Sequence, residues 1–205
     1  MKRLLVLAAM SLAVAACGHV AEVPDHSYFR MPKPAQLPVS PEQVFDVPIV
    51  VGLLAADGLY ADRALIYALD PDARELRQYH YQLWTDPPTR LLQRRLLVEL
   101  RESAIAPLVI DELAASQAAL RISGVILRFE RVPRPEGGHM AAVAIKLRAD
   151  RPDGSPFIDE VYRADAIADG HRLVATTDAL AAAVDMIFAE FHADLLAHPE
   201  ADNAR

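Results

Sequence analysis

The sequence of 205 residues contains a single cysteine, Cys17, and this scarcity excludes several kinds of chemistry. One thiol forms no intramolecular disulfide and no thiolate zinc cluster. No apolar run reaches the ~20 residues that a membrane-spanning helix needs. The formal net charge is −7 and no basic stripe is present, so recognition of nucleic acid through charge is not expected. These absences leave one domain's worth of chain without an internal disulfide, a thiolate metal site or a membrane-spanning helix.

The segment before Cys17 has the pattern of a secretory signal peptide. Residues 1–16 contain Lys2 and Arg3, continue as an alanine-rich apolar stretch, and end in small residues directly before the cysteine. This arrangement predicts cleavage at a lipobox and acylation of Cys17, for example with palmitate. The alternative is an ordinary secreted protein whose only cysteine lies near the cleavage site by chance. Gly18 stands where aspartate would favour the inner membrane, so we expect an outer-membrane lipoprotein on the periplasmic face.

Proline divides the remaining chain into a tether and a domain. Residues 17–46 carry five prolines and little apolar periodicity, which predicts an extended, lipidated tether. The bulky residues at 28–32 interrupt it, and we expect this piece to dock on the domain or on a partner. The folded domain is predicted over residues 47–198, followed by a polar tail over 199–205.

The hydrophobic pattern of the domain predicts strands at 47–54, 64–69, 76–84, 120–132, 141–149 and 157–167. The segment 86–88 predicts the start of a helix that ends near residue 103, and Thr177 or Asp178 is expected to cap a second, longer helix. Residues 105–116 are ambiguous between a loop and a short helix. The arginines of the first helix have helical spacing and are expected on its solvated face (Arg90, Arg94, Arg95, Arg101). The order of elements predicts an α+β two-layer sandwich, a mainly antiparallel sheet with two main helices packed on one face.

Motifs of catalysis and metal binding are missing from the sequence. There is no nucleophile elbow, no Walker loop and no dinucleotide-binding glycine pattern, and no two of the seven histidines have helical metal-ligand spacing. We therefore predict no enzyme activity, no metal and no cofactor. A hydrolytic triad assembled from distant residues stays open as an alternative.

Aromatic residues give the strongest indication of a binding surface. Tyrosine and tryptophan combine a large apolar area with a polar group, which suits interfaces. The candidate partner-binding residues are Tyr28, Phe29, Tyr60, Tyr67, Tyr81 and Trp84. The alternative, weighed equally for those of the strand region, is that they form ordinary core.

Several of these pieces together resemble the ABC-type transport auxiliary lipoproteins, the family of paraquat-inducible protein C. The resemblance rests on residues 28–32 (YFRMP), the strand at 47–54, residues 59–63 (LYADR) and residues 81–88 (YQLWTDPP) before a leucine-rich helix. It implies an outer-membrane lipoprotein that works with a mammalian-cell-entry (MCE) domain protein and its ABC permease, and it makes a homo-oligomer plausible. No catalytic residue is implied.

Two functions are thus expected from the sequence. The first is a docking or auxiliary component of an MCE-type ABC system that moves lipids or other hydrophobic molecules across the periplasm. The second is a periplasmic lipid-binding carrier lipoprotein. A carrier requires an enclosed cavity, whereas a docking component requires an exposed aromatic or apolar surface.

Overall fold

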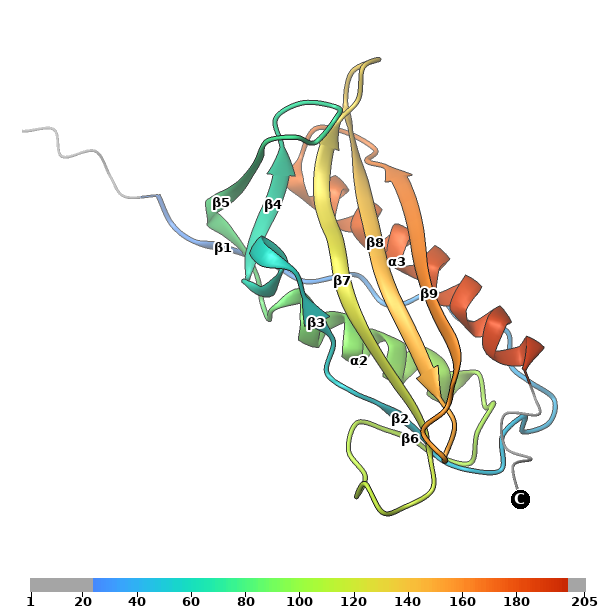
Figure 1. Ribbon diagram of the computed structural model, residues 1–205. Coiled ribbons are helices and arrows are strands. Elements are labelled where there is room, and N and C mark those ends of the chain that lie inside the picture. Colours follow the sequence, from blue (N-terminus) through green and yellow to red (C-terminus); the bar gives the residue numbers. More distant parts are fainter. Residues whose placement is uncertain (1–23, 199–205) are drawn as a thin grey trace, which may run out of the picture.

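The computed structural model describes residues 24–198 (Figure 1). The signal segment 1–16, Cys17 and the tail 199–205 lie outside the described residues.

Three long strands form the central part of the sheet. β7 (Leu120–Pro133), β8 (His139–Asp150) and β9 (Pro156–Ile167) pair antiparallel in chain order. The first connection contains Gly137 and Gly138, whose φ angles of 94° and 77° lie in the left-handed region that glycine adopts without a steric penalty. The meander expected from the short glycine-bearing turns is confirmed.

Shorter strands extend the sheet beyond β7. β4 (Ala64–Ala68) pairs antiparallel with β5 (Leu76–Trp84) and parallel with β7. β2 (Ile49–Val51) and β3 (Ala55–Ala56) pair parallel with β7, and β6 (Val109–Ile110) pairs parallel with β2. The parallel pairs arise because the chain crosses over through a helix before it re-enters the sheet. The α+β class is confirmed, and the sheet is mixed, with its long ladders antiparallel.

Two helices cover one face of this sheet. α2 (Pro88–Glu102) and α3 (Leu173–Ala197) lie on the same side of the strands, behind them in Figure 1. The space between the layers is filled by side chains that are fully shielded from solvent, among them Leu96, Ile145 and Phe188. The burial of each such side chain contributes about 1.5–3 kcal/mol.

The sequence misplaced the start of α3, and it left residues 105–116 open between a loop and a short helix. α3 begins at Leu173, four to five residues before the expected cap, and Thr177 is buried inside the helix with its hydroxyl donating to the carbonyl of Val174 at 2.8 Å. This bond back to the preceding turn lets threonine occupy a helix interior. Residues 105–116 form no helix; they contain the two-residue β6 and a loop.

Candidate functional site

The proline-rich segment after Pro24 is extended, and it lies along the domain. Its first part is β1 (Ser27–Phe29), which pairs parallel with the end of β5. The chain then crosses the helical side of the molecule, where Leu37 and Phe45 are buried, before it enters β2 (Figure 1). We call residues 27–46 the strap. It meets the expectation that the bulky residues at 28–32 dock on the domain.

A buried arginine fastens the strap to both helices. Arg95 of α2 is only 5% exposed. Its Nη1 donates to the carbonyl oxygen of Pro32 at 2.7 Å and its Nη2 to that of Lys33 at 3.3 Å. Its Nε donates to Asp185 of α3 at 2.7 Å, and the other oxygen of Asp185 accepts from the backbone N–H of Ala35 at 3.2 Å. One guanidinium therefore connects α2, α3 and the strap.

The position of Arg95 corrects the sequence expectation that it lies on a solvated face. Its neighbour Arg94 is exposed and pairs with Asp86 at 2.9 Å, as expected. Arg95 is enclosed because α3 and the strap cover that side of α2. The sequence did contain a signal for the environment of Arg95. Glu99 lies one helical turn later, and an i,i+4 ion pair places both residues on the same face of the helix.

Glu99 is the third charged group of this cluster, and its carboxyl is held away from water. Its side chain is 1% exposed, and its nearest oxygen lies 3.3 Å from Nε of Arg95. Burial and the negative charge of Asp185 together raise the pKa of Glu99 to about 8, although the positive charge of Arg95 opposes both effects. The carboxyl is therefore largely protonated at neutral pH.

Replacing this carboxyl changes how stability depends on pH. Between the ordinary pKa of 4.5 and about 8, the folded chain keeps a proton that the unfolded chain has lost. The unfolding free energy contributed by Glu99 therefore falls as pH rises, by ~1.4 kcal/mol per pH unit. Glu99→Gln should remove this slope, so its stability advantage over the natural chain should grow from about pH 5 to about pH 8.

Urea denaturation at several pH values measures this difference. Glu102→Gln is the matched control, because Glu102 is exposed on the same helix. A Glu99→Gln advantage that stays constant across this pH range would contradict the assignment.

The outer end of the strap gathers aromatic rings. Tyr28 pairs in register with Leu83 and Phe29 with Trp84. Tyr28 is 57% exposed, and the ring of His26 stacks on it with centroids 6.3 Å apart. The same imidazole meets the ring of Tyr81 edge-on at 5.5 Å. The structure thus brings Tyr28 and Tyr81 together on an exposed edge.

A bulge in β5 places these rings. The ladder passes from the pair Ala64–Leu83 directly to the pair Ile66–Gln78, so residues 79–82 are left over on β5. A bulge of this kind bends its strand and redirects its side chains. The ring of Tyr81 consequently lies against His26, the residue before the strap, whereas Tyr79 contacts Tyr67, with centroids 4.5 Å apart.

The remaining candidate residues are structural or lie elsewhere. Trp84 is 1% exposed and packs on Phe129 at 5.7 Å between centroids. Tyr60 is buried, and its hydroxyl donates to the buried carboxylate of Glu130. Burial and this hydrogen bond raise the pKa of Tyr60 above its usual range. Tyr67 belongs to a separate polar cluster, and the half-buried Phe29 packs against the core.

That separate cluster was missed from the sequence. Arg131 Nη1 donates to the hydroxyl of Tyr79 at 2.7 Å, and its Nη2 lies 2.9 Å from Nδ1 of His139. Burial, the Arg131 charge and nearby His171 lower the pKa of His139. These residues come from distant parts of the sequence, so no local spacing signalled them.

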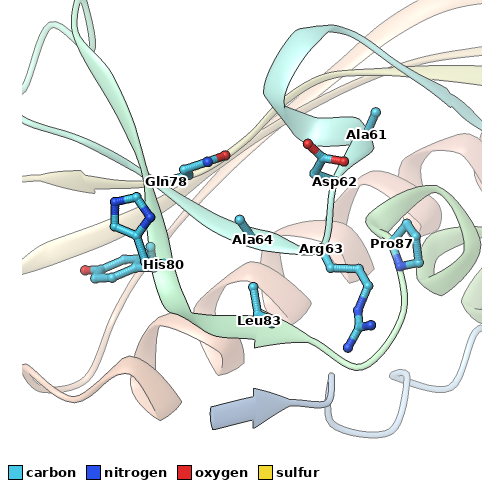
Figure 2. Close-up of a pocket in the computed structure, with 9 residues that line it drawn as sticks. Ala61, Asp62, Arg63, Ala64, Gln78, His80, Leu83 and Pro87 are labelled. Atoms are coloured by element: carbon cyan, nitrogen blue, oxygen red, sulfur yellow. The ribbon is translucent and has the colours of Figure 1, made fainter. Parts of the chain in front are cut away.

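Shallow hollows flank the strap and β5. One lies between β4, β5 and the start of α2, where Figure 2 shows Arg63, His80 and Pro87 around it. Another lies between the strap and the first turns of α3; its walls are Tyr28, Phe29, Arg30, Met31, Pro32, Thr85, Val174, Thr177 and Asp178. Both open to solvent, so they offer contact surfaces rather than enclosed chambers.

Within residues 24–198, no three histidine or carboxylate side chains come together as ligands for an ion. Over the same range, no helix has the length and apolar character to cross a bilayer.

Among known proteins, only solved structures are similar to this chain, and they define the class of its fold. No family model and no curated protein matches the sequence. Solved structures do match. Protein XCC0632 from Xanthomonas campestris, described as DUF330, aligns with TM-score 0.72 at 13% identity over 85% of this chain and 98% of its own. The hypothetical protein CT253 from Chlamydia trachomatis aligns with TM-score 0.51 at 11% identity, over 77% of this chain and 99% of its own.

A third structure is a dodecamer of PelC from Paraburkholderia phytofirmans, with TM-score 0.44 at 16% identity over 80% of this chain and 96% of that one. At that score it carries no argument. At these identities, the first two matches establish a shared fold only.

The resemblance to the ABC-type transport auxiliary lipoproteins was wrong. The matching structures are described as DUF330 and as CT253, and not as relatives of paraquat-inducible protein C. The resemblance misled because the residues on which it rested have structural roles. Trp84 and Tyr60 are core residues, and Pro88 begins α2, so these residues serve folding and are weak markers of a family.

Proposed function

We propose that the chain is a lipid-anchored, non-enzymatic docking protein on the periplasmic face of the outer membrane. It would serve an assembly that moves lipids or other hydrophobic molecules across the periplasm. The lipobox before Cys17 supports the anchor, and the filled interior of the domain favours docking over a carrier function. The proposal therefore rests on position and packing rather than on a reaction.

One observation carries this proposal: the described domain begins a short distance along the chain after Cys17, the proposed anchor. Ser27, where β1 begins, lies ten positions after Cys17. A fully extended chain of this length spans at most ~36 Å. From Ser27 onward the strap is held by the β1–β5 pairing and by Arg95. A domain held this near one leaflet is placed to receive a partner that reaches across the periplasm.

The packing favours docking over the carrier function. An acyl-chain carrier needs a chamber between sheet and helices. Here that space is occupied by interlocking side chains such as Ile145, Phe188 and Phe191, each with no exposed surface. The hollows described above lie outside this layer and open to solvent.

The partners follow from the same proposal. An MCE-domain protein together with its ABC permease is the first candidate, because such a system supplies hydrophobic cargo to a docking protein. A homo-oligomer is proposed as the docking form, and light scattering on the purified lipoprotein measures it.

Labelling with palmitate in cells tests the anchor. We expect the natural chain to incorporate the label and to fractionate with outer membranes, and we expect Cys17→Ser to incorporate none, since Cys17 is the only thiol. Gly18→Asp keeps the cysteine and should keep the label. Equal labelling of Cys17→Ser and the natural chain would refute acylation at this residue.

Mild cross-linking followed by affinity capture tests the docking role. Recovery of an MCE-domain protein with the natural chain supports it. Two results together would overturn the docking role. These are the capture of no MCE-domain protein and the turnover of a substrate by the purified chain.

A further inference from the structure

The exposed edge beside the lipid anchor has the composition of a membrane contact. It consists of His26, Tyr28 and Tyr81, in which the His26 ring contacts each of the two tyrosine rings, with Arg63 and Arg30 beside them. The guanidinium carbon of Arg63 lies 5.2 Å from the centre of the Tyr28 ring. We call these five residues the anchor-side cluster.

The cluster is solvent-exposed although it is rich in rings. Tyr28 keeps 57% of its surface exposed, and His26 and Arg30 are also exposed. The alternate residues Phe29 and Trp84 point inward to the core. The β1–β5 pairing therefore holds Tyr28 outward rigidly, which a flexible tether would not do.

The length of chain between Cys17 and the cluster brings it to a bilayer. His26 lies nine positions after Cys17, a span of at most ~32 Å. The described chain enters the domain at this edge, next to β1 (Figure 1). Of the described domain, this edge is joined to Cys17 by the shortest length of chain.

The chemistry of the cluster matches a lipid headgroup layer. Tyrosine is enriched at membrane–water interfaces because its ring is apolar and its hydroxyl remains hydrated. Guanidinium groups form bidentate hydrogen bonds with phosphate. Within residues 24–198, neither Arg30 nor Arg63 forms a salt bridge, and Arg63 uses only its Nε, which donates to the carbonyl of Trp84 at 3.0 Å.

Two carboxylates on the same edge are compatible with a contact between the cluster and lipid headgroups. Asp25 and Asp62 are exposed next to the cluster in sequence. They limit the attraction of the edge to anionic lipid, so the contact depends on the rings as well as on charge.

We propose that the anchor-side cluster lies against the phospholipid headgroups of the leaflet that holds Cys17. This rests on the lipid anchor of the proposed function and adds an orientation to it. The rings and guanidinium groups form a second contact, so that the domain is held at a fixed angle and the face opposite this edge points into the periplasm.

Quenching by brominated phospholipids measures this contact. The full-length lipidated chain is reconstituted in phosphatidylethanolamine–phosphatidylglycerol vesicles, with or without bromine on the acyl chains near the headgroups. Tyr28→Trp adds an indole at the cluster, and Ile167→Trp adds one at a site of similar exposure, 65%, at the end of β9. The buried Trp84 supplies the common background emission.

The proposal expects brominated lipid to remove most of the emission added by Tyr28→Trp and little of that added by Ile167→Trp. Tyr28→Trp combined with Tyr81→Ser, Arg30→Gln and Arg63→Gln should lose part of this quenching. Equal quenching at the two sites, or none at either, would overturn the proposal. If the emission of Tyr28→Trp is protected from quenching only after a second protein is added, the membrane contact is refuted in favour of a protein partner.

Failure of the anchor gives a different result. In that case the purified chain lacks the acyl mass on Cys17 and does not sediment with vesicles, whatever its emission. A chain that carries the acyl mass and sediments, but shows no quenching at Tyr28→Trp, refutes the membrane contact alone.

Discussion

Arg95→Met should unfasten the strap and destabilise the domain by about 3–5 kcal/mol, because it removes one partner of a buried ion pair. The substitution keeps a long side chain but leaves Asp185 and the carbonyl oxygens of Pro32 and Lys33 without their donor. Asp185 would also keep a charge that is largely shielded from water, with Glu99 beside it. Loss of this size is a large fraction of the 5–15 kcal/mol that stabilises a typical domain.

Arg94→Met is the matched control for this prediction. The two arginines are neighbours on α2, but Arg94 is exposed and its ion pair with Asp86 is solvated, so its loss should cost less than about 1 kcal/mol. Urea denaturation measures both variants, and hydrogen exchange over residues 30–37 reports release of the strap. Equal stability of the two variants would show that Arg95 does not fasten the strap.

Trp84→Ala should destabilise the domain by about 3–5 kcal/mol, as removal of a large buried aromatic side chain does. Trp84 is 1% exposed and packs on Phe129. Its backbone N–H donates to the carbonyl of Arg63 at 2.7 Å, so the residue also joins β5 to the start of β4. The substitution leaves a cavity at this junction, where β1, β4 and β5 meet.

The same experiment separates a core residue from a binding residue. Tyr81→Ala removes a ring from the exposed edge and should leave the unfolding free energy nearly unchanged, while Trp84→Phe should show an intermediate loss. Circular dichroism follows unfolding in each case, since Trp84 is the only tryptophan. A Trp84→Ala chain that is as stable as the natural one but fails to capture its partner would assign Trp84 to the binding surface.

These two predictions concern the same structural device. The strap follows the proposed lipidation site in the chain, and it is held to the domain through β1 at one end and through Arg95 further along. Since the strap is fastened to both helices, the anchor-side cluster and the helical layer are held in one orientation. Release of the strap would lengthen the free chain between Cys17 and the domain, and it would loosen any orientation at the membrane.

Much of the domain was predictable because its signals are local. Short glycine-bearing turns between alternating strands predicted the β7–β8–β9 meander, and leucines at i+4 spacing predicted α2. The stripe of apolar residues in α3 was also found, although its start was misplaced. Periodicity of this kind reports which face of an element is buried.

The candidate site was predictable only in part. The bulky residues at 28–32 indicated docking, but β1 has three residues and pairs with a strand about 55 positions later. So short a strand has no periodicity of its own. Tyr28 and Trp84 also look alike by composition, yet the parallel register directs one outward and the other into the core.

The sequence by itself determined the lipobox at Cys17, the α+β class, the meander and the lack of catalytic motifs, because each depends on residues close together in the chain. Only the tertiary structure decided that Arg95 is buried, that the strap crosses both helices and that Tyr28 and Tyr81 share an exposed edge. Those features depend on which surface lies across from a given side chain, and this is set by packing between distant segments.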